Sequence, residues 1–364
     1  MIRSCDSGSM PFVGDSAKFL VGAEQFRLHQ REESAEYFEK CVVESFLDKL
    51  GVKLEVPNYP QFRDMSEMLL SMMDGLEKID AGYLETKVPS LNSDGNQIPE
   101  VLAIEQNSQI IQEKANNTFE VRVCVTGPYT LASFFPYKDE EIFSRLGNVV
   151  AKIVEQNIFS NKHGKTSLIS VDEPLFGLLD DPLIDFGSKG RENLLDTWET
   201  IFHKAKSKNA QTMLHLHSTA NPLFWEIPSL EVIDSHVDDP ITKMKKTGEL
   251  LESKDKFLKA SVTVNDFDLL IKNKIVADSK EKLAESNINE KIADTWTQIN
   301  HGLIDPIIFL DTVDTMKNRL ANVVERFGEQ RILYSGPECG LKGYPTYQNA
   351  IECLRRASSV VKSF

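Results

Sequence analysis

Residues 211–236 read QTMLHLHSTANPLFWEIPSLEVIDSH and contain two short apolar runs, QTMLHLHS and LEVIDSH. Brief runs of this kind are typical of strands that are buried on both faces. Each run ends in histidine: His215 and His217 close the first, and His236 closes the second. The chain has only seven histidines, so three of them at the ends of two neighbouring strands require an explanation.

Similar short apolar runs recur along the chain and alternate with stretches of helical periodicity. Further strand-like runs lie at 119–127, 165–174, 256–264 and 330–336, with a first at IRSCD and a poorly marked one near 53–58. Amphipathic stretches with a 3.6-residue period lie at 193–208, 316–329 and 347–361. Strands separated by helix-length segments pair in parallel, because a parallel neighbour needs a crossover connection.

About eight such units predict an α/β fold class, and within it a single (β/α)₈ TIM barrel. An open doubly wound sheet is the alternative, weakened because no G-x-G-x-x-G follows the first strand. We expect one catalytic domain over residues 1–364, since no Pro/Ser/Gly-rich linker divides the chain. Excursions are expected near 86–117, as a polar loop, and near 266–300, where dense charge indicates solvated helices or a mobile flap.

Composition narrows the classes of partner. Forty-one Lys and Arg against 55 Asp and Glu give a net charge of −14, which argues against a nucleic-acid surface or a basic membrane patch. No apolar segment approaches the roughly 20 residues that span a bilayer. The five cysteines are odd in number and scattered, so a disulfide framework is not expected. These features favour a reducing, cytoplasmic location.

Three histidines and one cysteine form the strongest candidate site. In a barrel, reactive groups gather at the carboxyl ends of the strands, where His215, His217, His236 and Cys339 are all expected. Imidazole nitrogens and a thiolate at one mouth would suit a tetrahedral zinc site. The alternative is that the histidines are core residues hydrogen-bonded to carbonyls. The remaining histidines lie in polar or helical contexts and are predicted to be surface residues.

Two adjacent carboxylates, Asp172 and Glu173, end another predicted strand in the sequence VDEP. One interpretation is that they cap a helix N-terminus. The functional interpretation is that they bind a substrate ammonium group or hydrogen-bond a metal-bound imidazole.

Several of these stretches, taken in order, resemble the catalytic barrel of cobalamin-independent methionine synthase, in the short single-barrel form found in archaea. The matching motifs are DSGSMPF (6–12), TGPYTLA (126–132), VDEPLFG (171–177), HLHS (215–218), VIDSH (232–236) and GPECGLKG (336–343). The last is close to the family's Asp-Cys-Gly-Leu-Lys signature and is the most specific.

The resemblance implies roles for individual residues. The zinc ligands of the family fall on His215, His217, His236 and Cys339, although His217 replaces a cysteine and His236 a glutamate. Asp172 matches the aspartate that holds the homocysteine amino group.

The resemblance also implies a binding site for the rest of the substrate. Ser7, Gly8 and Ser9 fall where the family holds the substrate carboxylate, and Tyr59 falls where the larger enzymes have a substrate-binding glutamate. The tryptophan that stacks on the pterin has no counterpart.

The implied activity is a zinc-dependent S-methyltransferase of methionine biosynthesis that moves a methyl group to homocysteine or a similar small thiol. Three neutral imidazoles and one thiolate around Zn²⁺ carry a formal charge of +1, where the family's set carries −1. Such a site suits either a very reactive methyl donor or a substrate other than a plain thiol. The donor is expected to be methyl-folate, methylcobalamin or a methylated corrinoid carrier protein, and the last two are more reactive than methyl-folate. Two other functions remain open: a metal-dependent barrel hydrolase, and a metal-binding paralogue without turnover.

Overall fold

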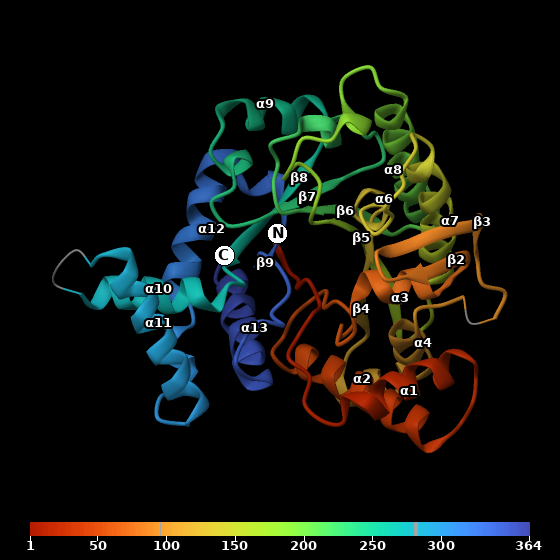
Figure 1. Ribbon diagram of the computed structural model, residues 1–364. Coiled ribbons are helices and arrows are strands. Elements are labelled where there is room, and N and C mark those ends of the chain that lie inside the picture. The colour runs from red at the N-terminus through yellow and green to blue at the C-terminus, as the bar shows by residue number, and fades with distance from the viewer. Residues whose placement is uncertain (95, 280–282) are drawn as a thin grey trace.

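The computed structural model describes residues 1–94, 96–279 and 283–364, and it is built around a curled parallel sheet (Figure 1). Seven strands pair in the order β1-β9-β8-β7-β6-β5-β4. Their side chains are almost all buried, which is why the sequence shows continuous apolar runs. The strands are β1 (Arg3–Ser4), β4 (Phe119–Thr126), β5 (Gly164–Glu173), β6 (Gln211–Leu216), β7 (Val232–Ser235), β8 (Phe257–Thr263) and β9 (Ile332–Pro337).

The eighth position of the barrel is filled by an irregular segment that joins the two edges of this sheet. Val56 forms a parallel bridge with Cys5, which follows β1, and Asn58 forms one with Arg122 of β4. The strand expected near 53–58 is therefore reduced to isolated bridges. The physical reason is Pro57, which lacks a backbone N–H and serves only as the acceptor for Arg122 N at 2.9 Å.

Helices cover the outside of the sheet and follow most of its strands, so the structure confirms the predicted α/β barrel (Figure 1). The amphipathic stretches predicted as helices are α8 (Lys189–Ser207), α12 (Val313–Phe327) and α13 (Tyr347–Lys362). The others are α1 (Ser16–Arg27), α2 (Glu33–Gly51), α3 (Met65–Ser71), α4 (Pro99–Gln106), α5 (Ser108–Ala115), α6 (Pro128–Ala132), α7 (Ile142–Gln156), α9 (Lys245–Ser253), α10 (Phe267–Asp278) and α11 (Glu285–Asn300). None of the described helices is both long and apolar enough to cross a bilayer.

The segment 86–117, expected to be a polar loop or excursion, contains regular structure. It begins within the second strand of the antiparallel hairpin β2 (Met73–Ile79) and β3 (Gly82–Leu91) and continues through α4 and α5. The hairpin is partly exposed, so its side chains give no apolar run. Near 266–300 the expected helices are present as α10 and α11, and residues 280–282 between them lie outside the described residues.

One glycine in the barrel wall allows a close approach between backbones. A Cβ at Gly336 of β9 would lie 1.9 Å from the carbonyl oxygen of Cys5. We expect Gly336→Ala to lower the free energy of unfolding by roughly 1–3 kcal/mol, because the two segments must separate. Gly51→Ala is the control, since a Cβ there meets nothing within 4 Å. Equal thermal denaturation midpoints for the two variants would contradict this account of the wall.

Candidate metal centre

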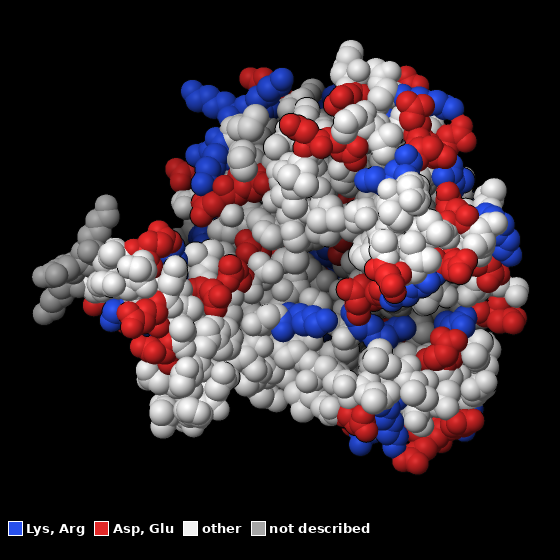
Figure 2. Space-filling model, viewed as in Figure 1, with Lys and Arg blue, Asp and Glu red and all other residues white. Residues whose placement is uncertain are grey.

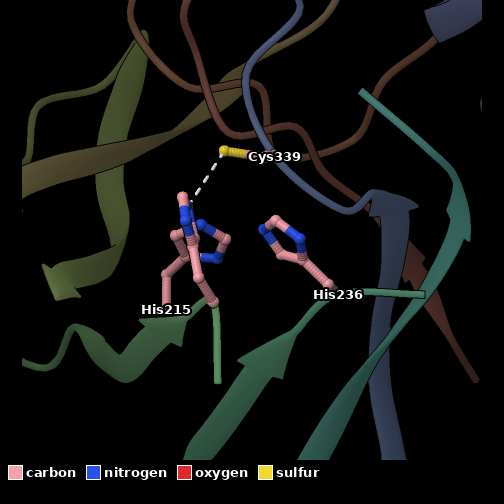
Figure 3. A group of neighbouring side chains, drawn as sticks. His215, His236 and Cys339 are labelled. Atoms are coloured by element: carbon pink, nitrogen blue, oxygen red, sulfur yellow. Dashed lines mark hydrogen bonds between the residues drawn. The ribbon is translucent and has the colours of Figure 1, made fainter. Parts of the chain in front are cut away.

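Four potential ligands converge at the carboxyl ends of three strands. His215 lies in β6 and His217 directly follows it, His236 follows β7, and Cys339 lies two residues beyond β9. One ligand atom from each residue lies within 4.8 Å of the others. Figure 3 shows His215, His236 and Cys339 directed toward a common space. The closed barrel thus brings together side chains that are up to 124 positions apart, as the sequence predicted.

The hydrogen bonding of this cluster tests whether the residues fit a metal. Within the described part of the chain, Nε2 of His215 and Nε2 of His236 are buried and have no hydrogen-bond partner outside the cluster, while Nδ1 of His215 faces Asp234 Oδ2 at 3.2 Å. Sγ of Cys339 lies 3.6 Å from Nε2 of His217, the contact drawn as a dashed line in Figure 3. Core histidines held by carbonyls would show partners, so this alternative does not account for the cluster. Three imidazoles and a thiol whose converging ligand atoms have no partner outside the cluster fit Zn²⁺.

Electrostatics prepare the cysteine to be a ligand. Burial acts to raise the pKa of Cys339, but hydrogen bonding with His215 and His217 outweighs it and lowers that pKa to about 6. Burial likewise acts to lower the pKa of His215, yet the adjacent Asp234 carboxylate raises it to about 10. Burial lowers the pKa of His236. The thiolate form of Cys339, which is the form that binds metals, therefore predominates at neutral pH.

Asp234 is a site residue that the sequence interpretation missed. It is fully buried in β7, and its Oδ2 lies 3.2 Å from Nδ1 of His215. Two buried cations hold the same carboxylate: Nζ of Lys259 at 2.8 Å and Nη2 of Arg122 at 3.4 Å. A carboxylate beside the second nitrogen of a metal-binding imidazole fixes the ring's orientation. The sequence feature that could have identified Asp234 is its position two residues before His236, because this spacing places both side chains on one face of the strand.

Asp172 and Glu173 face opposite sides of β5 and have different environments. Asp172 lies opposite His215 in the parallel pairing of β5 and β6, and it accepts a 2.7 Å hydrogen bond from Ser170 Oγ. Its burial raises its pKa, opposed by the nearby His215 and Arg122. Asp172 thus lies beside the cluster, where a substrate group could reach it.

Glu173 instead anchors helices outside the sheet. Its carboxylate accepts hydrogen bonds from the backbone N–H groups of Tyr129 and Thr130, at 3.0 and 2.7 Å, in the first turn of α6. It also accepts from Nε1 of Trp198 in α8 at 2.9 Å. Glu173 is therefore a hydrogen-bond partner of a helix N-terminus, which is the structural interpretation given above for the Asp172–Glu173 pair. No described hydrogen bond connects Glu173 to the histidine and cysteine cluster.

The loop Ser7–Ser9, predicted to bind the substrate carboxylate, packs against the loop that carries Cys339, called here the cysteine loop. Ser9 O accepts a 2.7 Å hydrogen bond from Leu341 N, and a Cβ on Gly340 would lie 1.8 Å from Ser9 Oγ. Gly8 adopts a φ of 101°, in the region that favours glycine, and the nearby Oγ of Ser7 is buried without a described partner. Ser7, Gly8 and Ser9 therefore approach the cluster from the β1 side.

Tyr59 lies deeper in the barrel wall than a substrate-binding role suggests. It is fully buried, and its hydroxyl donates a 3.0 Å hydrogen bond to the carbonyl of Cys124. Gln61 Nε2 donates to the same hydroxyl at 3.1 Å.

The fold and site together define an α/β barrel with a candidate N₃S metal centre at its carboxyl end. No protein-family model and no curated protein matches the sequence. Among solved structures, the chain is similar to a B12-independent methionine synthase from Shewanella sp. W3-18-1 determined in complex with selenomethionine, with a TM-score of 0.55 and 14% identity. The likeness covers 100% of this chain and 98% of that one, so it shows a shared fold over the whole length.

We expect the purified protein to bind one equivalent of Zn²⁺, and His217→Ala and His236→Ala each to weaken binding by at least about tenfold, because each removes a ligand. His203→Ala is the control, since His203 is exposed on α8 outside the cluster. Metal titration and X-ray absorption would measure affinity and the number of nitrogen and sulfur ligands. Unchanged affinity in both variants would rule out the four-residue centre.

We expect Asp234→Asn to weaken Zn²⁺ binding by roughly 10–100-fold while all four ligands remain, because the His215 ring loses its charged partner. Asp311→Asn serves as the control: Asp311 also pairs with a cation, Arg319 at 2.6 Å, but lies outside the cluster. Circular dichroism would verify folding of both variants. Equal zinc affinities would show that Asp234 acts only in barrel stability.

Proposed function

We propose that the protein is a zinc-dependent S-methyltransferase that moves a methyl group to the thiol of homocysteine or a close analogue. The observation that carries the proposal is the cluster of His215, His217, His236 and Cys339, with ligand atoms within 4.8 Å of one another at a barrel mouth. The barrel shared with a B12-independent methionine synthase supports it. The resemblance of GPECGLKG to that family's cysteine motif supports it further.

Each member of the centre has a distinct part in this proposal. His215, His217, His236 and Cys339 would hold Zn²⁺, which as a Lewis acid lowers the pKa of a thiol so that thiolate forms at neutral pH. The His215 and His217 imidazoles already favour the thiolate form of Cys339. Asp234 orients His215. Lys259 and the other neighbours of Asp234 outweigh the effect of burial and hold its pKa low, so its carboxyl group is already deprotonated.

The acceptor is positioned by residues around the rim. Asp172, beside His215, would pair with the substrate ammonium, and the Ser7–Ser9 loop would hold its carboxylate. Fixing both ends of an amino acid directs its sulfur toward the cluster, and such orientation supplies much of the rate of a displacement reaction. The low exposure of Asp172 strengthens this pairing, because water screens it less.

The zinc-loaded protein is expected to make methionine from homocysteine when given methyl-folate, methylcobalamin, a methylated corrinoid protein or another activated methyl compound. Asp172→Asn is expected to raise KM for homocysteine by about tenfold or more, because an ion pair in a desolvated site is lost. With 4-mercaptobutyrate, which is homocysteine without its amino group, wild type and Asp172→Asn should react equally. Absence of methylated thiol with every donor would refute the proposed function.

A further inference from the structure

A cavity of about 930 Å³ opens directly beside the metal centre. His217 and His236 form one wall. The opposite wall comes from the segment 265–269, which enters α10, and from Trp296 of α11. Figure 1 shows α10 and α11 projecting from the barrel beside α12 and α13. A molecule in this cavity would contact the exposed side of the candidate ligands.

Carboxylates dominate the charge of this lining. Asp238, Asp266, Asp268 and Glu338 line the cavity, and the single cationic side chain among the described lining residues is Arg319. Arg319 is itself held by the Asp311 carboxylate at 2.6 Å. Figure 2 shows more acidic than basic side chains over α10 and α11. The cavity therefore presents a negative potential to a ligand.

Three of these carboxylates accept hydrogen bonds from neutral donors. Asp266 accepts from Leu269 N at 3.1 Å, and Asp268 accepts from Nε1 of Trp296 at 2.5 Å. Glu338 is only 5% exposed and accepts from two backbone N–H groups, at 2.8 and 2.9 Å. Within the described chain, none of the three is paired with a lysine or arginine.

Two aromatic rings complete the wall next to these carboxylates. Phe267 and Trp296 have ring centroids 5.5 Å apart and an interplanar angle of 51°. Aromatic faces attract cations, indole most strongly, and aromatic walls with carboxylates are suited to methylated onium groups. On the side of the cluster the lining is His217 and His236, and Nε2 of His236 is buried without a described partner.

We propose that this cavity receives the methyl donor, and that the donor is an onium cation: a sulfonium or a quaternary ammonium compound. The proposal rests on the proposed function, since it places the donor opposite the acceptor thiol. The thiolate sulfur attacks the methyl carbon and forms an S–C bond. The bond from that carbon to the onium centre breaks, and its electron pair remains with the departing neutral thioether or amine. Anion and cation become two neutral products, so no further reactant is required.

The same lining disfavours an anionic donor. Methyl-folate carries carboxylates on its glutamate tail, and these would face Asp266, Asp268 and Glu338 across the cavity. Like charges so placed repel.

The test compares donors carrying a ¹³C-methyl group: S-methyl-L-methionine, glycine betaine and methyl-tetrahydrofolate, with homocysteine and the zinc-loaded full chain. We expect the better onium donor to exceed methyl-tetrahydrofolate in kcat/KM by at least about tenfold. In Asp266→Asn/Asp268→Asn, both side chains keep a hydrogen-bond acceptor and lose their charge, and KM for that donor should rise by about tenfold. Asp278→Asn/Asp294→Asn removes two charges from α10 and α11 outside the lining and should leave KM unchanged.

Calorimetric binding of S-methyl-L-methionine separates this proposal from the function on which it rests. Binding that is lost in Asp266→Asn/Asp268→Asn, retained in the control and weakened by salt supports the cation site even if no donor is turned over. Faster transfer from methyl-tetrahydrofolate than from either onium donor overturns the proposal while leaving the methyltransferase intact. Absence of onium binding to the wild type, or equal binding by both double variants, also overturns it.

Discussion

The carboxylate of Asp234 connects the interior of the barrel to the candidate metal centre. One of its oxygens meets Lys259 at 2.8 Å, and the other lies between Arg122 and His215, at 3.4 and 3.2 Å. Moving one of these charges out of water without its partners would cost several kcal/mol. The position of His215 is therefore fixed by β4, β7 and β8 together, because each contributes a member of this network.

The interior of this barrel differs in composition from a barrel filled by aliphatic layers. Arg122 and Lys259 are fully or almost fully buried, and both reach Asp234. Lys259 also donates to the carbonyl of Pro337, two residues before Cys339, at 2.6 Å. The network thus positions both the imidazole of His215 and the start of the cysteine loop. A buried ion pair contributes little net stability, so a role in placing the ligands accounts better for these charges.

The sequence predicted the elements with strong periodicity and the meeting of the histidine and cysteine side chains at strand ends. Strands such as 119–127 and helices such as 347–361 appear close to their predicted bounds, because burial imposes a pattern that a single sequence displays. The hairpin β2–β3 was missed, since a partly exposed pair of strands has no such pattern. The segment near 53–58 was misjudged because Pro57 interrupts its hydrogen bonding.

The candidate metal-binding side chains could be predicted from the sequence, whereas the buried charged residues that position them could not. His215, His217, His236 and Cys339 are recognisable because imidazole and thiol groups are rare and stand at strand ends. Asp234, Arg122 and Lys259 lie inside strands that otherwise read as apolar, and their ion pairs span up to 112 positions of the chain. Asp172 and Glu173 could not be separated by sequence, because the direction of each side chain depends on the register of β5.

The positions of the charged residues show which groups could balance the charge of a metal held by the cluster. Arg122 and Lys259 balance Asp172 and Asp234, so the buried network sums to zero beneath the cluster. Three neutral imidazoles and one thiolate would leave a bound divalent ion with a formal charge of +1, and the neutral network would not offset it. Glu338, with Oε2 3.9 Å from Nδ1 of His236 and no described cationic partner, is the nearest carboxylate that can. Negative charge in this region lies on the carboxylates of the cavity wall, where an incoming molecule would meet it first.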